Sequence, residues 1–76
     1  MNQPDKEPSL ADELPEGTAF TMHGDSTYTE YYIVIRTGVL GILAQEYKRA
    51  NTTSPFAKNR DRVLMPWTSG PFYLMT

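Results

Sequence analysis

The stretch Tyr28–Tyr47, YTEYYIVIRTGVLGILAQEY, holds the longest apolar run in the chain and decides the fold. Its first part, Thr29–Arg36, is rich in Tyr, Ile and Val, which favour strands. Alternate strand residues point to opposite faces. We therefore expect Tyr31, Ile33 and Ile35 to face the core, while the opposite face, which mixes polar and apolar residues, is only partly covered.

The second part, Val39–Ala50, is compatible with two structures. On a helical wheel its apolar residues fall in one arc that is interrupted only by Ile42. The run Ala44–Glu46 also favours a helix. The alternative is a hairpin that turns at Arg36–Val39, after which the chain continues as a strand. Of the two, we predict the helix.

The remainder of the chain predicts shorter elements. Thr18–His23 reads as a strand that forms an antiparallel hairpin with the next one, and Phe56–Asp61 as a short helical turn. Arg62–Met65 and Phe72–Met75 read as two short strands. The predicted class is α+β, a small antiparallel sheet with one helix (β-β-α-β-β). If residues 39–46 form a strand instead, the alternative is an all-β five-stranded SH3-like small barrel.

Charge and composition divide the chain into two regions. Residues 1–17 are rich in proline and carboxylates, so we expect a disordered acidic arm. Residues 18–76 are expected to form a single small globular domain. Residues 1–30 carry seven acids and one base, a net charge of −6, whereas residues 31–76 carry six bases and two acids, a net charge of +4.

The residue inventory argues against catalysis. The chain has no cysteine, which excludes disulfides, thiolate zinc sites, iron–sulfur clusters and cysteine nucleophiles. Its one histidine, His23, stands next to Asp25 and Ser26 in a predicted turn, too close in sequence to form a triad easily. We expect a protein that is not an enzyme and that holds no metal or cofactor.

Targeting signals are also missing from the sequence. No apolar run approaches the ~20 residues of a membrane span. The acidic, polar N-terminus does not resemble a signal peptide. We therefore expect a cytoplasmic protein that has no membrane partner.

The aromatic content indicates a binding role. Five Tyr, three Phe and one Trp are many for 76 residues, and Tyr and Trp are favoured at protein interfaces. We predict a non-catalytic binding module, a regulator or inhibitor that binds a larger protein through Tyr28, Tyr32 and Trp67, which we expect to lie outside the core. Small cysteine-free domains also gain stability by oligomerising, so a homodimer is a further expectation.

Two alternatives rest on the basic residues. A basic surface beside exposed aromatics could bind nucleic acid. The residues that would form it are Arg36, Lys48, Arg49, Lys58, Arg60 and Arg62. The same combination at a subunit interface could instead bind a nucleotide-like small molecule.

Overall fold

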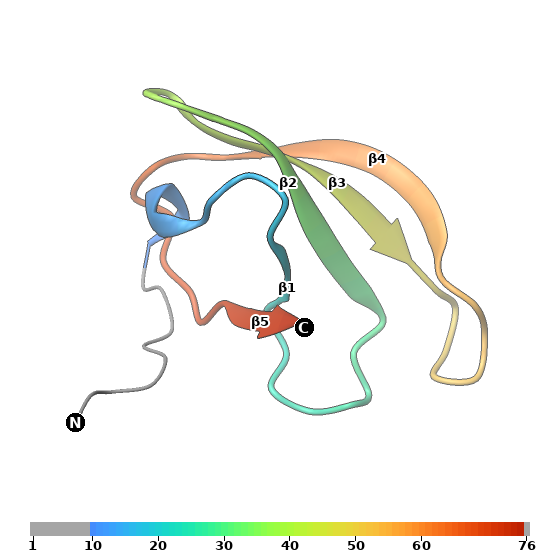
Figure 1. Cartoon of the computed structure of the whole chain (residues 1–76). Coiled ribbons are helices and arrows are strands. Elements are labelled where there is room, and N and C mark those ends of the chain that lie inside the picture. The colour runs from blue at the N-terminus through green and yellow to red at the C-terminus, as the bar shows by residue number, and fades with distance from the viewer. Residues whose placement is uncertain (1–9, 76) are drawn as a thin grey trace.

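The computed structural model describes residues 10–75, which form a five-stranded antiparallel sheet with the strand order β4-β3-β2-β1-β5 (Figure 1). The elements are a 3-10 turn and five strands: η1 (Ala11–Glu13), β1 (Ala19–Thr21), β2 (Glu30–Gly38), β3 (Gly41–Lys48), β4 (Ala57–Leu64) and β5 (Tyr73–Met75). Within the described residues there is no α-helix. The predicted α+β class is therefore wrong, and the chain is nearly all-β, as in the five-stranded alternative.

The predicted helix over Val39–Ala50 is replaced by β3, and the predicted helical turn over Phe56–Asp61 by most of β4. β3 is paired along its length with β2 on one side and β4 on the other. Gly41 has a φ of +123°, a value that no α-helix contains. Strand pairing on both sides of β3 thus overrides the helical propensity of this segment.

The β2–β3 hairpin turns at Val39 and Leu40, between the paired residues Gly38 and Gly41. This turn lies farther along the chain than the alternative Arg36–Val39 turn. Gly41 is required there, because a Cβ at this position would collide with the carbonyl oxygen of Leu64 in the neighbouring strand. The turn therefore fixes the register of both β2 and β4 against β3.

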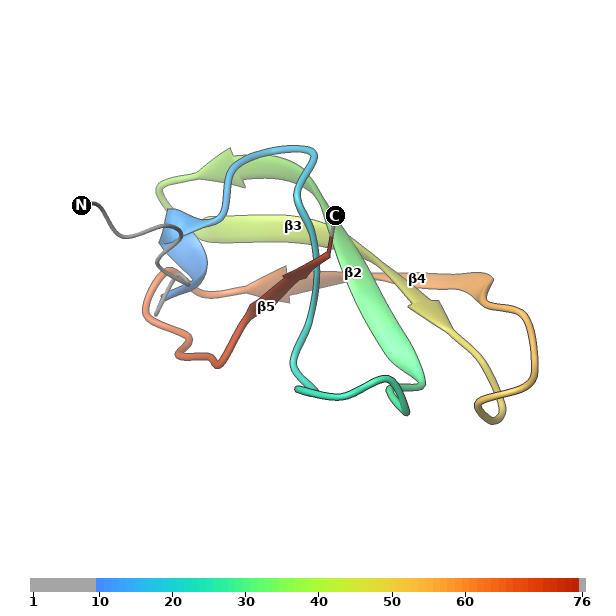
Figure 2. The same cartoon turned by 60° about the horizontal axis from the view of Figure 1, so that its bottom comes forward.

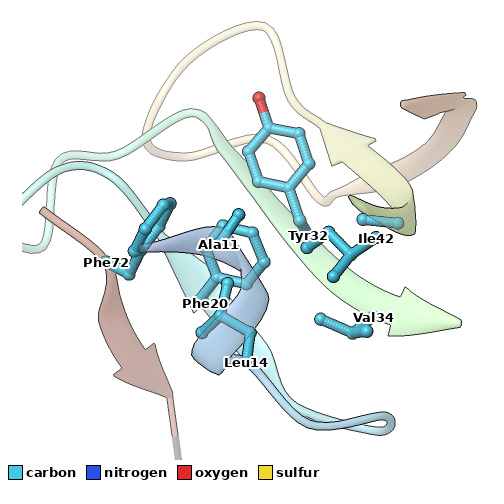
Figure 3. Packing of buried hydrophobic residues seen from close by; sticks show 8 residues of the cluster. Ala11, Leu14, Phe20, Tyr32, Val34, Ile42 and Phe72 are labelled. Carbon is cyan, nitrogen blue, oxygen red and sulfur yellow. The ribbon is translucent and has the colours of Figure 1, made fainter. Parts of the chain in front are cut away.

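The core lies on one side of the β2–β3–β4 sheet, which we call the inner face (Figure 3). Tyr32 and Val34 point into it, and the ring of Phe20 stacks on that of Tyr32 with centroids 5.3 Å apart. The buried apolar residues are Ala11, Leu14, Phe20, Tyr32, Val34, Ile42, Ala44 and Phe72.

The predicted core face of β2 is consequently wrong. Tyr31 and Ile33 lie on the opposite side, half-exposed, and Ile35 is 44% exposed at a β-bulge. The physical reason is that η1, β1 and the segment before β5 cover the side of Tyr32 and Val34. Both faces of β2 carry apolar residues, so the sequence pattern alone does not distinguish them.

The N-terminal segment also differs from the prediction. Residues 1–9 of the predicted arm lie outside the described residues. From Leu10 onward the chain belongs to the folded unit, because Ala11 and Leu14 are buried in the core. The amide of Ala11 donates to the carbonyl of Thr68 at 2.9 Å, which links η1 to the segment that follows β4. The predicted boundary at residue 18 is therefore too late.

We expect Gly41→Ala to lower the free energy of unfolding by about 2 kcal/mol or more, because the new Cβ meets both an unfavourable φ and a backbone atom of β4. The matched control is Gly38→Ala, across the same turn, where a Cβ meets nothing within 4 Å. We expect this variant to change stability by less than about 1 kcal/mol. Chemical denaturation of both variants measures the difference, and equal effects would contradict the proposed role of Gly41.

Candidate protein-binding surface

The three predicted partner-binding aromatics lie in different environments. Trp67 is 70% exposed, as expected of a contact residue. Tyr32 is a core residue, 4% exposed, so its predicted exposed position is wrong; Phe20 covers its ring and two carboxylates surround its hydroxyl. Tyr28 is half-buried. The structure does not bring the three together.

Tyr28 belongs to a second group of rings, on the side of the sheet away from the core. Its ring stacks on Phe56 with centroids 5.6 Å apart, and Phe56 meets Tyr31 edge-on at 4.8 Å. Tyr31 in turn stacks on Tyr47, its partner across the β2–β3 ladder, at 5.0 Å. These contacts hold the β3–β4 connection against the sheet, so the rings have a structural role.

Arg49 is part of this group and is not available as a basic contact residue. Its guanidinium carbon lies 4.4 Å from the centre of the Phe56 ring. The guanidinium donates to the carbonyl of Tyr28 at 2.8 Å and to that of Thr52 at 3.1 Å. A nucleotide base that stacks on Phe56 would have to displace this arginine.

The other basic residues do not form one free surface either. Lys48 lies 4.0 Å from Glu30, and Arg62 and Arg60 lie 3.4 and 3.9 Å from Glu46. Arg36 and Lys58 are exposed on β2 and β4, at different positions along the sheet. The predicted basic surface is thus largely neutralised by the chain's own carboxylates.

Glu46 is the one buried carboxylate among the described residues, with 2% of its surface exposed on the inner face. The amide of Asn59 donates to its Oε1 at 2.9 Å, and the guanidinium of Arg62 donates to its Oε2 at 3.4 Å. The hydroxyl of Tyr32 lies 3.2 Å from the same Oε2. A bulge in the β3–β4 ladder between Gln45 and Tyr47 accommodates this arrangement.

The environment of Tyr32 changes its acidity. Its hydroxyl also lies 3.1 Å from Oε2 of Glu30, so it shares one proton between two carboxylates. Burial, together with the negative charges of Glu30 and Glu46, raises the pKa of Tyr32 far above its ordinary value. The phenol therefore stays neutral wherever the protein is folded under ordinary conditions.

Three of the most exposed apolar side chains, those of Val39, Leu40 and Trp67, belong to two turns at one end of the molecule. Val39 and Leu40, at the apex of the β2–β3 hairpin, are 91% and 80% exposed. The chain after β4 forms a turn at the same end, closed by a bond from the Thr68 amide to the Met65 carbonyl at 3.0 Å (Figures 1 and 2). This turn carries Met65 and Trp67. We call these four residues, Val39, Leu40, Met65 and Trp67, the end surface.

Sequence reasoning found Trp67 but missed the other members of the end surface. The signal was the tetrapeptide Gly38-Val39-Leu40-Gly41, in which two apolar residues stand between glycines. If Gly38 and Gly41 flank a hairpin turn, the two residues between them, Val39 and Leu40, must lie at the apex of that hairpin. The helix prediction buried Val39 and Leu40 instead and hid this surface.

No metal-binding group of side chains emerges from the described residues. Asp25 accepts bonds from the hydroxyl and the amide of Thr27 at 2.6 and 3.0 Å, and the Thr27 hydroxyl in particular lowers the pKa of that carboxyl. Between residues 10 and 75, no three potential metal ligands cluster. In the same range no helix is long and apolar enough to cross a membrane.

We expect Glu46→Ala to lower the free energy of unfolding by about 1–3 kcal/mol, because Asn59 and Arg62 lose their acceptor on the inner face. The control is Glu16→Ala, an exposed carboxylate whose one contact, to the Thr37 amide, is long at 3.4 Å. We expect its effect to stay within about 0.5 kcal/mol. Urea denaturation compares the two variants, and similar losses would show that the Glu46 contacts contribute little.

A second prediction concerns high pH. The pKa of Tyr32 is raised in the folded state, so the stability it contributes is complete below the ordinary tyrosine pKa of about 10 and is lost as pH rises above that value. The unfolding free energy of the wild type should therefore fall more steeply above pH ~10 than that of Tyr32→Phe. Parallel pH profiles for the two proteins would contradict the shift.

The comparisons with known proteins do not supply an identity. No family model matches the chain, and neither a curated protein nor a solved structure does. The function is therefore inferred from the surfaces of the molecule itself.

Proposed function

We propose that this chain is a non-catalytic binding module that regulates or inhibits a larger protein, and that it docks through the end surface. The supporting observation is the hairpin apex, where Val39 and Leu40 are almost fully exposed. Apolar side chains gain free energy when they leave water. Two adjacent ones that the fold leaves uncovered at an apex are typical of a contact that a partner completes.

The hairpin holds these side chains in a defined position. Gly38 and Gly41 are paired directly below the apex, and the backbone of Gly41 packs against Leu64 of β4. Little conformational freedom is lost when such a turn binds, which favours affinity. Trp67, in the turn at the same end of the molecule, adds the residue type most enriched among energetically dominant interface contacts.

The expected partner is a protein with an apolar groove or pocket that receives the hairpin apex. Complete burial of a Val or Leu side chain is worth about 1.5–3 kcal/mol. The pair could thus contribute roughly 100-fold or more to affinity. Because the contact is apolar, its strength should depend little on ionic strength, in contrast to a phosphate-binding surface.

The test is a capture experiment with three baits from an extract of the native cells, at high salt and after nuclease treatment. The baits are the wild type, Val39→Ser/Leu40→Ser, and Leu74→Ser, which exchanges an exposed leucine of β5 as the matched control. We expect the wild type and the control to retain one protein that the double variant loses. With that protein purified, calorimetry should show about 100-fold weaker binding by the double variant.

Equal retention by all three baits would contradict a role for the hairpin apex. Retention that disappears with nuclease or salt would instead favour the nucleic-acid alternative. Thermal unfolding of the three baits, measured in parallel, shows whether any loss of binding arises from loss of fold.

A further inference from the structure

A second uncovered surface lies on the side of the β2–β3–β4 sheet away from the core, which we call the outer face. β3 contributes Leu43 and Gln45 to it, since their neighbours Ile42, Ala44 and Glu46 are buried on the inner face. Directly paired strand residues share a face. The outer face thus consists of Tyr31, Ile33, Ile35, Arg36, Leu43, Gln45, Tyr47, Lys58, Asp61 and Val63.

The middle of this face is apolar and is left open by the fold. Val63, paired with Leu43, is 62% exposed, and Ile35 at the bulge of β2 is 44% exposed. β1 and β5 continue the sheet beyond β2, and Phe20 of β1 and Phe72, just before β5, point into the core on the inner face (Figure 3). An antiparallel sheet ordinarily turns a polar face to water, so this apolar face calls for a partner.

Two opposite charges flank the apolar residues. Arg36, the partner of Leu43, lies on β2, and Asp61, the partner of Gln45, lies on β4. Both are exposed. Among the described residues neither side chain has an ion pair or a hydrogen bond, in contrast to Arg60, Arg62 and Lys48. On the outer face, β2 therefore carries a free positive group, Arg36, and β4 carries a free negative group, Asp61, together with the exposed Lys58 three residues before it.

We infer that the outer face binds a second copy of this chain, with Arg36 of each copy paired with Asp61 of the other. Arg36 and Asp61 are free charges of opposite sign on the two sides of an apolar centre, so this pair makes the surface complementary to itself. Such self-complementarity is what a two-fold symmetric dimer requires. A foreign partner would not need both charges to be placed in this way.

The geometry of the sheet supports this pairing. A two-fold axis that runs along β3, between two sheets stacked about 10 Å apart, lays β2 of one copy over β4 of the other. Arg36 of one copy then lies directly over Val63 of the other copy, because within each copy both residues are paired with Leu43. Asp61 is two residues farther along β4, about 7 Å from Val63, so the backbones at Arg36 and Asp61 lie about 12 Å apart across the two sheets. An extended arginine and an aspartate side chain together can bridge that distance.

The dimer would complete a core that is small for a free-standing domain. A chain of this size buries only about 60% of the surface that it exposes when unfolded. Stacking two outer faces would bury Leu43, Val63 and Ile35 between two sheets. The end surface would stay free to bind its target, so this inference does not depend on the proposed function.

Charge reversal tests the inference directly. In a dimer of the Arg36→Asp variant, the new carboxylate of each copy would face the Asp61 carboxylate of the other copy. In a dimer of the Asp61→Arg variant, the new guanidinium group of each copy would face the Arg36 guanidinium group of the other copy. We expect each variant alone to dissociate about tenfold or more readily than the wild type in analytical ultracentrifugation. An equimolar mixture of the two variants restores both opposite-charge contacts, so it should form a 1:1 dimer that neither variant forms alone.

The matched control is Asp12→Arg, which reverses an exposed carboxylate of η1 and should leave the dimer unchanged. Circular dichroism of each variant shows that the fold is retained. A wild-type protein that stays monomeric from micromolar to millimolar concentration would overturn the inference. So would a wild-type dimer that both charge reversals leave intact, or a mixture of the variants that does not associate.

Discussion

The structure depends on the pairing of β3 with a neighbour on each side. This pairing fixes which residues of Gly41–Lys48 point inward and which point outward, and the Gly41 turn sets its register. The inner side chains then form one side of the core, and Glu46 inserts a buried carboxylate among them. The outer side chains of β3, Leu43, Gln45 and Tyr47, are only half-buried. Both surfaces proposed for binding follow from this asymmetry: one is the open face of the sheet, and the other is the turn at the end of its central hairpin.

Glu46 explains why the basic half of the chain does not behave as a basic surface. A buried carboxylate is costly unless cations and donors surround it. Arg60, Arg62 and Asn59 of β4 meet that need, while Arg49 fixes the β3–β4 connection through backbone carbonyls and the Phe56 ring. These three arginines are thus engaged within the fold, which lowers the support for nucleic-acid binding.

The sequence predicted the strands β1, β2 and β5 and the exposed position of Trp67. The sequence did not predict the structure correctly where the local residue pattern suits two structures equally well. The arc of apolar residues after Val39 suits a helix when it is considered alone, and only pairing with β4 decides for a strand. In β2, Tyr31, Ile33 and Ile35 are as apolar as Tyr32 and Val34, so the covered face depends on where Phe20 and Leu14 pack. The positions of Arg60 and Arg62 likewise depend on Glu46, because both lie close to its buried carboxylate. The predicted helix did not place Glu46 in the core, so the sequence did not indicate these contacts.

We infer that the chain has one covered and one open side, and that the open outer face and the end surface bind different partners. Methyl NMR spectra recorded over a dilution series separate the two surfaces. We expect the methyl signals of Ile33, Ile35, Leu43 and Val63 to shift with protein concentration. Those of Val34 and Ile42 in the core, and of Val39 and Leu40 at the hairpin apex, should stay constant. Outer-face signals that do not respond to concentration, or shifts confined to the hairpin apex, would contradict it.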